Sequence, residues 1–253
     1  ISFEIIPPRN GERVEEILKK VESLVALNPD FISITKGAGG SLRGGTVPIA
    51  HLIKQKIGIE TMAHLTCIDT PVEELENNLM DHRYLGIGNI LALRGDPPRD
   101  ALENYAKREE FSYHKYAKDL VRQISNMNQG FYLKRKMDKK PSGRDANFRD
   151  GEKTDFCIAV AGHPEGHPDC PNHEETLIHL KQKVDAGADF IVTQMVFDAD
   201  IYGSFVEKCR KIGITVPIIP GIRPITKYQI IPHIEEFFHV TVPDTFKTGL
   251  INK

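Results

Sequence analysis

The chain has 253 residues, of which 40% are hydrophobic and 27% charged, with 20 Gly and 16 Pro. This composition excludes collagen-like, coiled-coil and disordered chains, and the length suffices for one large α/β domain or two small ones. Thirty-three basic and 35 acidic side chains leave a formal charge of −2, which argues against a dedicated nucleic-acid or membrane-surface binder and favours a small neutral or anionic substrate.

Short β-branched and aromatic segments alternate with longer amphipathic segments along the chain, a rhythm typical of βαβ units. The predicted strands cover residues 2–6, 31–35, 61–67, 89–95, 155–162, 190–197 and 216–222. The predicted helices cover residues 12–27, 47–57, 71–85, 114–127, 173–186, 199–212 and 227–239. Seven strand–helix pairs without a shift in composition predict one domain over residues 1–253, either a closed (β/α)8 barrel or an open doubly wound sheet.

A glycine-rich turn at residues 37–45 fits neither of the common nucleotide-binding motifs. Leu42 occupies the place of the third glycine of a dinucleotide fingerprint, and Gly45 the place of the lysine of a phosphate loop. The turn therefore argues against a Rossmann sheet and against a nucleoside triphosphatase. Its glycines most simply permit a mobile or left-handed turn.

Residues 129–154 interrupt the α/β pattern with many Lys and Arg side chains among Gly, Pro, Asp and Asn. We interpret this segment as an inserted surface loop. Its charge indicates either a solvated surface or a basic patch for an acidic partner. Loops of this length are often lids or other functional segments.

The cysteines and the apolar segments bear on the cellular setting. The longest strongly apolar stretch, residues 190–197, is far shorter than the roughly 20 residues that span a bilayer. The four cysteines show no Cys-x-x-Cys spacing, so a reducing, cytoplasmic setting fits best. Because the chain starts at Ile1 within a strand-like run, we expect it to be part of a longer protein, and a missing targeting segment is weak evidence.

Polar side chains within or just after the predicted apolar strands are the main candidates for chemistry, because barrel enzymes react at the carboxyl ends of their strands. These residues are Glu4, Thr35, His64, Arg94, Asp96, His163 and Gln194. Glu4 lies between Phe3 and Ile5, where desolvation would raise its pKa and suit it to act as a general acid. It could instead be a solvent-facing or ion-paired residue, His64 a core histidine, and Asp96 a turn or N-cap aspartate.

Four potential metal ligands, His163, His167, Cys170 and His173, lie within eleven residues. Imidazole and thiolate are zinc ligands, but prolines interrupt this segment and no established zinc-binding spacing accompanies it. We therefore expect no metal here. The preferred interpretation is a Pro-rich loop after a strand, with His163 at the rim of the site.

Several of these residues belong to motifs that resemble the methylenetetrahydrofolate reductase family, in the same order along residues 1 to about 225. The motifs are Ser2–Arg9, Ser33–Thr35, His64–Cys67, Leu91–Asp96, Lys183–Ala188, Thr193–Gln194 and Ile219–Ile222. The resemblance implies a flavin-dependent (β/α)8 barrel. Such an enzyme uses FAD in ping-pong fashion to pass a hydride from NADH or NADPH to 5,10-methylenetetrahydrofolate, which gives 5-methyltetrahydrofolate for methionine synthesis.

The resemblance also implies roles for single residues. Glu4 looks like the general acid that opens the five-membered ring of the folate, Asp96 like the carboxylate beside flavin and pterin, and Gln194 like a folate contact. Both Glu4 and Asp96 would also touch the folate. The residues that resemble flavin contacts are Thr35, His64, Arg94, Gly95, Asp96, Tyr116, Ala117, His163, His167 and Lys183.

The chain departs from the family pattern in four places. His163 stands where a tyrosine is expected, Thr176 where some members have an acidic residue, and the basic segment 130–154 is inserted. The eighth strand is not visible before Lys253, so we expect it to lie outside this sequence, as does the regulatory domain of larger members.

We expect a homo-oligomer without nucleic-acid or membrane partners. A folate-binding or methyl-transferring barrel without redox activity and a metal-dependent barrel hydrolase are the alternatives.

Overall fold

The computed structural model describes residues 1–8, 14–37, 44–68, 70–96, 112–134 and 147–251. The chain divides into two compact units, Ile1–Ile158 and Ala159–Lys253, and each is described by itself. Among the described residues, no helix has the length and apolar character of a membrane span. Cys67, Cys157, Cys170 and Cys209 are all free thiols.

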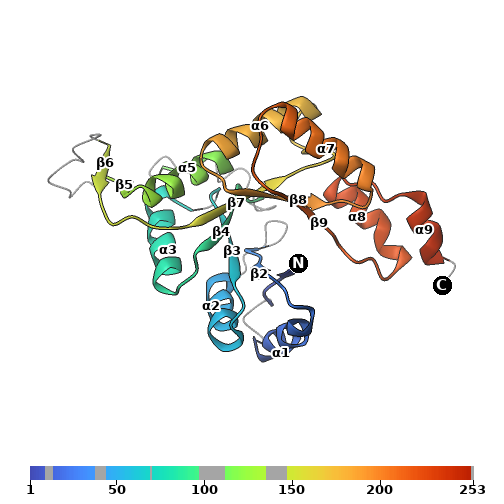
Figure 1. Cartoon of the computed structure of the whole chain (residues 1–253), viewed down its shortest axis with the longest axis horizontal. Helices are drawn as coiled ribbons and strands as arrows, with labels where there is room; N and C mark the ends of the chain where they lie inside the picture. Colours follow the sequence, from blue (N-terminus) through green and yellow to red (C-terminus); the bar gives the residue numbers. More distant parts are fainter. Residues whose placement is uncertain (9–13, 38–43, 69, 97–111, 135–146, 252–253) are drawn as a thin grey trace. The chain divides into compact units, whose positions relative to one another are not determined.

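The first unit begins with four strand–helix pairs (Figure 1). They are β1 (Ser2–Ile5), α1 (Val14–Leu24) with the 3-10 turn η2 (Val25–Leu27), β2 (Phe31–Ile34), α2 (Thr46–Ile57), β3 (Thr61–Thr66), α3 (Val72–Tyr84), β4 (Asn89–Leu93) and α5 (Ala117–Asn128). Each strand pairs in parallel with the next, and Glu4 lies opposite Ser33 in the register. Parallel neighbours need such helical crossovers, which is why strands and helices alternate.

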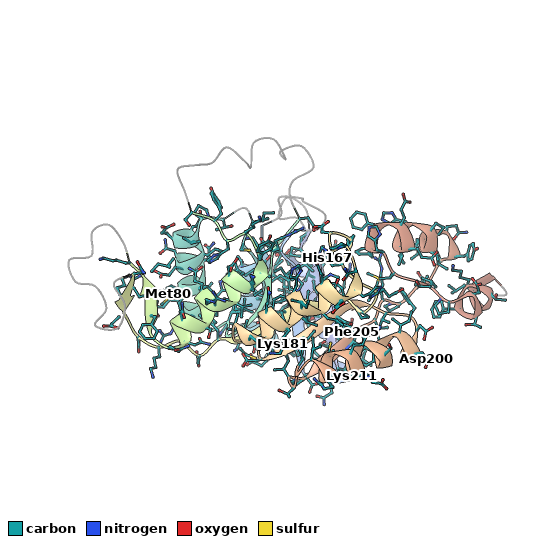
Figure 2. The ribbon with its side chains drawn as sticks, turned by 90° about the horizontal axis from the view of Figure 1, so that it is seen from above. Met80, His167, Lys181, Asp200, Phe205 and Lys211 are labelled. Atoms are coloured by element: carbon teal, nitrogen blue, oxygen red, sulfur yellow. The ribbon has the colours of Figure 1, made fainter. Side chains whose placement is uncertain are left out.

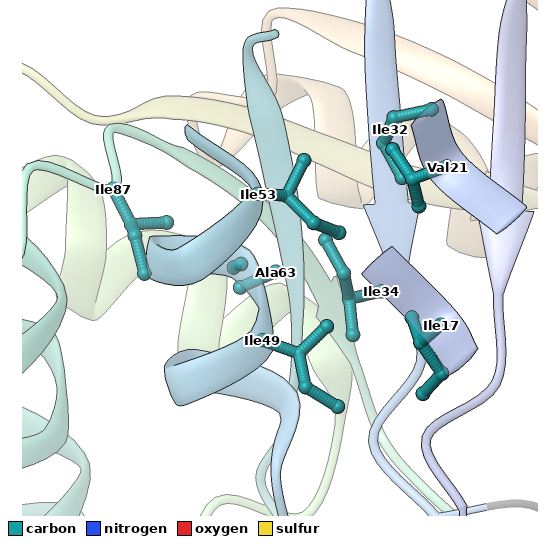
Figure 3. Packing of buried hydrophobic residues seen from close by; sticks show 9 residues of the cluster. Ile17, Val21, Ile32, Ile34, Ile49, Ile53, Ala63 and Ile87 are labelled. Atoms are coloured by element: carbon teal, nitrogen blue, oxygen red, sulfur yellow. The ribbon is translucent and has the colours of Figure 1, made fainter. Parts of the chain in front are cut away.

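The core of the first unit lies between these strands and the helices α1 and α2. Ile32 and Ile34 of β2 are fully buried against Ile17 of α1 and against Ile49 and Ile53 of α2 (Figure 3). Because successive side chains of a strand point to opposite faces, the residues between these isoleucines must lie on the face away from the helices. The core therefore fixes which strand residues remain available for a site.

The second unit continues the same alternation. Its elements are β7 (Cys157–Gly162), which starts at the end of the first unit, α6 (His173–Asp185), β8 (Phe190–Met195), α7 (Ala199–Lys211), β9 (Ile218–Gly221), the 3-10 turn η3 (Tyr228–Ile230), α8 (Ile231–Phe238) and α9 (Asp244–Ile251). The three strands pair in parallel. Beyond them, Ile225, Ile231, Ile234, Val240 and Val242 form a separate small core.

The order of the parallel strands decides between the two folds that the sequence left open. The strands follow one another as β1-β2-β3-β4-β7-β8-β9, in chain order throughout. A doubly wound sheet reverses its strand order at a switch point, whereas a barrel does not. The predicted (β/α)8 barrel class is confirmed, and the described residues supply seven of its parallel strands.

Two segments differ from the sequence-based expectation. Within the segment expected to be an inserted loop, β5 (Phe131–Leu133) and β6 (Phe148–Asp150) form an antiparallel pair, and residues 135–146 lie outside the described part. The helix expected at 227–239 begins as the turn η3 and continues as α8, whose first turn contains Pro232. Helix α9 was not expected.

The β5–β6 pair is attached to α3 through a buried carboxylate. Glu76 of α3 is only 1% exposed, and its Oε2 accepts a hydrogen bond of 2.7 Å from the backbone N–H of Leu133. Its other oxygen pairs with Arg149 of β6, whose guanidinium lies 4.9 Å from the centre of the Tyr132 ring. A buried carboxylate needs such partners because the loss of hydration is costly.

We predict that Glu76→Ala lowers the free energy of unfolding by about 3 kcal/mol, because it leaves Arg149 and the Leu133 N–H without this acceptor. Urea denaturation measures the change. The control is Asp185→Ala, which removes the exposed ion pair with Lys181 and should cost less than about 1 kcal/mol. Equal effects of the two substitutions would contradict the proposed attachment.

Candidate functional site

Glu4 lies on the polar face of β1, away from the helices. Its neighbours Phe3 and Ile5 pack against the core shared with α1 and α2, so alternation places Glu4 on the opposite face. Ala63 of β3 also packs in that core, and His64 therefore shares the face of Glu4. The structure thus brings together two residues that the sequence suggested separately.

One nitrogen atom links Glu4, His64 and a serine of the strand between them. His64 Nε2 lies 3.7 Å from Glu4 Oε2 and 2.7 Å from Ser33 Oγ. Ser33 and His64 are buried, whereas the side chain of Glu4 remains 56% exposed. The carboxyl group of Glu4 is therefore accessible to solvent, whereas the neighbouring imidazole of His64 is buried.

Desolvation favours the uncharged forms of both titratable groups. It raises the pKa of Glu4 above its ordinary value and lowers the pKa of His64 to about 4. A neutral imidazole offers no positive charge that would stabilise a Glu4 carboxylate. Both shifts are in the direction that proton donation by Glu4 would require.

Thr35 follows β2 on the same face and has an unused polar atom. Its carbonyl oxygen accepts a hydrogen bond of 2.8 Å from Thr46 Oγ1 at the start of α2, which fixes the backbone here. Its hydroxyl is buried and has no hydrogen-bond partner among the described residues. Buried polar atoms are rarely left unsatisfied, so this hydroxyl fits a contact with a bound molecule.

The end of β4 carries Arg94, Gly95 and Asp96 in a fixed turn. The carbonyl oxygen of Arg94 accepts a hydrogen bond of 2.9 Å from the backbone N–H of Ile68. Gly95 has φ +87°, and a Cβ atom there would lie 3.0 Å from Thr66 Cβ, so only glycine fits without strain. Asp96 follows this turn with an exposed side chain.

Tyr116 and Ala117 form the start of α5. The backbone N–H of Tyr116 donates to the Asp119 carboxylate at 3.3 Å, which ties down the first turn. The exposed Tyr116 ring lies beside the ammonium groups of Lys115 and Lys118. The positive end of the helix dipole and the nearby ammonium groups suit an anionic group such as a phosphate.

In the second unit, His163 and His167 lie edge to face, with ring centres 4.6 Å apart. The pKa of His163 falls to about 3, mainly through desolvation and further through the charges of Lys183 and His167. Thr176 Oγ1 accepts from the backbone N–H of His167 at 3.2 Å and donates to the Asn172 carbonyl. Figure 2 shows His167 beside the end of α6 at which this helix begins. The threonine thus holds the loop of His167 in place.

Lys183 reaches from α6 to β7, where its ammonium group donates to the carbonyl oxygen of Ala161. Desolvation lowers its pKa to about 8, and the nearby thiol of Cys170 acts in the opposite direction. Cys170 Sγ itself lies 3.5 Å from His179 Nδ1. A lysine in such a setting gains from an anionic partner, because a negative charge would restore part of the lost solvation.

Gln194 lies at an irregular point of β8. The register between β8 and β9 shifts between Val192 and Met195, and Gln194 Oε1 accepts from the backbone N–H of Met195 at 2.9 Å. Such bulges re-aim side chains near active sites. The side chain of Gln194 is half-buried.

Sequence reasoning named Ser33 only within a family motif and gave it no role in the site. A signal was present, because Ser33 alternates with the isoleucines of an otherwise apolar strand in the same way as Glu4 does in β1. For the metal alternative, the described ranges contain no group of three or more His, Cys, Asp or Glu side chains arranged to hold a metal ion.

We predict that His64→Gln makes the stability less sensitive to acid. The wild-type imidazole has its pKa lowered from 6.5 to about 4, so the unfolded chain takes up a proton that the folded chain refuses, and stability is lost as the pH falls through this window. Between pH 7.5 and pH 5 this residue should account for on the order of 2 kcal/mol. Denaturant unfolding of both proteins at the two pH values measures it, and an unchanged difference would contradict a neutral His64.

Two solved structures share the fold at low sequence identity. A phosphonopyruvate hydrolase in complex with oxalate and Mg++ superposes with a TM-score of 0.52 and 12% identity, over 98% of this chain and 77% of its own. An uncharacterized protein from Clostridium thermocellum that binds two copies of 5-methyl-5,6,7,8-tetrahydrofolic acid superposes with a TM-score of 0.50 and 10% identity, over 99% and 75% of the two chains. At this identity the similarity concerns the fold alone.

Sequence relatives are much more specific. Residues 1–252 match the family described as methylenetetrahydrofolate reductase. Methylenetetrahydrofolate reductase (NADH) 1 of Zea mays is 38% identical over 98% of this chain, which spans only 39% of the maize protein. The 5,10-methylenetetrahydrofolate reductase of Escherichia coli (strain K12) is 35% identical over 96% of this chain and 70% of its own length. The chain belongs to the methylenetetrahydrofolate reductase family.

Proposed function

We propose that this chain reduces 5,10-methylenetetrahydrofolate to 5-methyltetrahydrofolate, with NADH or NADPH as the reductant, FAD as the cofactor and ping-pong kinetics. The observation that carries the proposal is the Glu4 carboxyl group, which is exposed, lies on the polar face and has its pKa raised by desolvation. Family membership supports the reaction class, and the maize relative is named for NADH.

The residues of the first unit fit one side of a flavin nucleotide. The unsatisfied Thr35 hydroxyl can bond a polar ring atom, and the fixed turn at Gly95 allows close approach of backbone. His64, Arg94 and Asp96 would complete these contacts, and Tyr116 and Ala117 at the start of α5 would face the diphosphate. When bound, FAD supplies a carrier that accepts a hydride from the nicotinamide and passes it to the folate.

In the second unit, one lysine and two histidines are proposed as flavin contacts. Lys183 suits a phosphate oxygen because its ammonium group is desolvated and donates to a neutral carbonyl oxygen, that of Ala161. His163 and His167 are proposed as further flavin contacts on the loop that Thr176 holds. The acidic residue expected at position 176 is therefore replaced by a hydroxyl with a structural role.

Glu4 is proposed to donate its proton to the amine nitrogen of the folate ring. The C–N bond of the five-membered ring then breaks, the electron pair stays on that nitrogen, and the remaining 5-iminium carbon becomes the hydride acceptor. Asp96 is proposed to stabilise this cation, since a fixed carboxylate opposite a developing positive charge lowers the barrier. Gln194 is proposed to contact the pterin through its amide.

The absorption spectrum of the purified protein tests the proposal most directly. We expect flavin bands that bleach on anaerobic addition of NADH or NADPH and recover on addition of 5,10-methylenetetrahydrofolate. Stronger bleaching by one nucleotide identifies the preferred reductant. Folate binding without any flavin band would favour the non-redox alternative, and stoichiometric zinc without flavin would favour the hydrolase.

We predict that Glu4→Gln slows the folate half-reaction by at least about 100-fold, because only this step needs the proton, while reduction of the flavin by NADH or NADPH stays within about twofold. Stopped-flow absorbance follows both half-reactions. The matched control is Glu22→Gln on the exposed side of α1, which should change neither rate. A comparable loss in both half-reactions would contradict the role of Glu4.

A further inference from the structure

Ser33 is a buried residue on the same strand face as Glu4, and its hydroxyl contacts the imidazole beside the proposed general acid. It lies opposite Glu4 in the β1–β2 register and 2.7 Å from His64 Nε2. We propose that Ser33 is a positioning residue, which acts through His64 to keep the Glu4 carboxyl group in its proton-donating form. This inference rests on the proposed function and adds a residue to it.

The side chains of Ser33 and Glu4 both lie near the same nitrogen atom, His64 Nε2. His64 Nε2 either accepts a hydrogen bond or carries a proton, and it cannot do both. When the Ser33 hydroxyl donates to it, the lone pair is used and the imidazole stays neutral. Glu4 Oε2, 3.7 Å away, then faces a nitrogen without a proton. A carboxylate gains no ion pair there, so the protonated acid is favoured.

On this face of the neighbouring strands, as far as the structure describes them, His64 is the titratable side chain that can change the charge next to Glu4. The side chains on this face of the adjacent strands are Ser33 and Thr35 near β2, Met62, His64 and Thr66 of β3, and Asn89, Leu91 and Leu93 of β4. Of this set only the imidazole titrates. Desolvation raises the pKa of Glu4 and lowers that of His64. A hydrogen bond donated by Ser33 to the neutral imidazole is a separate contribution that acts on His64 in the same direction.

Loss of the Ser33 hydroxyl should therefore make the protonated form of His64 and the ionised form of Glu4 more favourable. Without this hydrogen bond to its neutral form, His64 binds a proton more readily than in the wild type, and the imidazolium stabilises the Glu4 carboxylate and lowers the pKa of Glu4. The folate half-reaction needs the protonated acid, so its rate falls as the pH rises through that pKa. In Ser33→Ala this decline should begin at lower pH.

The experiment measures the pH profile of the folate half-reaction by stopped-flow in the flavin-loaded enzyme. For Ser33→Ala we expect the falling limb to move down by about one pH unit, with about a tenfold loss of rate above it. Reduction of the flavin by NADH or NADPH should change less than twofold. Ser33→Thr keeps a hydroxyl in a strand position that tolerates β-branching, and it should restore the profile.

Thr61→Val is the matched control. It removes a buried hydroxyl from β3 that has no hydrogen-bond partner among the described residues, and Thr61 pairs with Ile32 on the helix-covered side. Its pH profile should equal that of the wild type. His64 is left unchanged because it is itself proposed as a flavin contact.

The outcomes separate this inference from the proposed function. An unmoved falling limb in Ser33→Ala, or a Ser33→Thr variant that behaves like Ser33→Ala, overturns the role of Ser33 while the wild-type half-reactions still support the reductase. A merely structural serine would lower stability and both half-reactions together. Absence of flavin reduction in the wild type overturns the proposed function instead. Thermal unfolding of each variant identifies a protein that fails to fold, and Ser33→Thr then decides alone.

Discussion

The alternation of side chains along the parallel strands is the constraint on which the site depends. Helices α1 and α2 cover one face of β1, β2 and β3, and that face is filled with isoleucine. Every second residue of these strands is thereby excluded from the core and directed to the other face. Glu4, Ser33 and His64 are such residues, and the parallel register brings them side by side.

Desolvation then gives these side chains their chemical character. The same loss of water that costs a charged group its hydration makes Glu4 a weaker acid and His64 a weaker base. In the second unit, desolvation lowers the pKa of Lys183 to about 8. A bound anion would favour the protonated ammonium form. Within the first unit, the raised pKa of Glu4 suits the proposed protonation of a folate. Within the second unit, the desolvated ammonium group of Lys183 suits a phosphate oxygen.

The inserted segment contains a contact that its local polarity does not indicate. Its Lys and Arg residues predicted a solvated surface or a basic patch for an acidic partner. Arg149 pairs with a carboxylate of the same chain that is almost completely buried, and its guanidinium lies over the Tyr132 ring. The pairing partner, Glu76, lies 73 residues earlier in the chain, on a helix whose charged residues otherwise look like a solvent face. Such an ion pair has no signature in local sequence, because both side chains become buried only when the helix and the hairpin pack together.

The sequence by itself determined the order and approximate bounds of the strand–helix pairs, because hydrophobic periodicity and breaking residues are local properties. It also singled out Glu4 and His64 as polar residues in apolar strands, and its motifs indicated the family. Only the tertiary structure decided that Glu4 faces away from the helices, that Ser33 and Glu4 both lie near His64 Nε2, and that the segment after α5 forms a hairpin. These features depend on register, burial and contacts between distant segments, and such quantities exist only once the strands are paired and the helices packed.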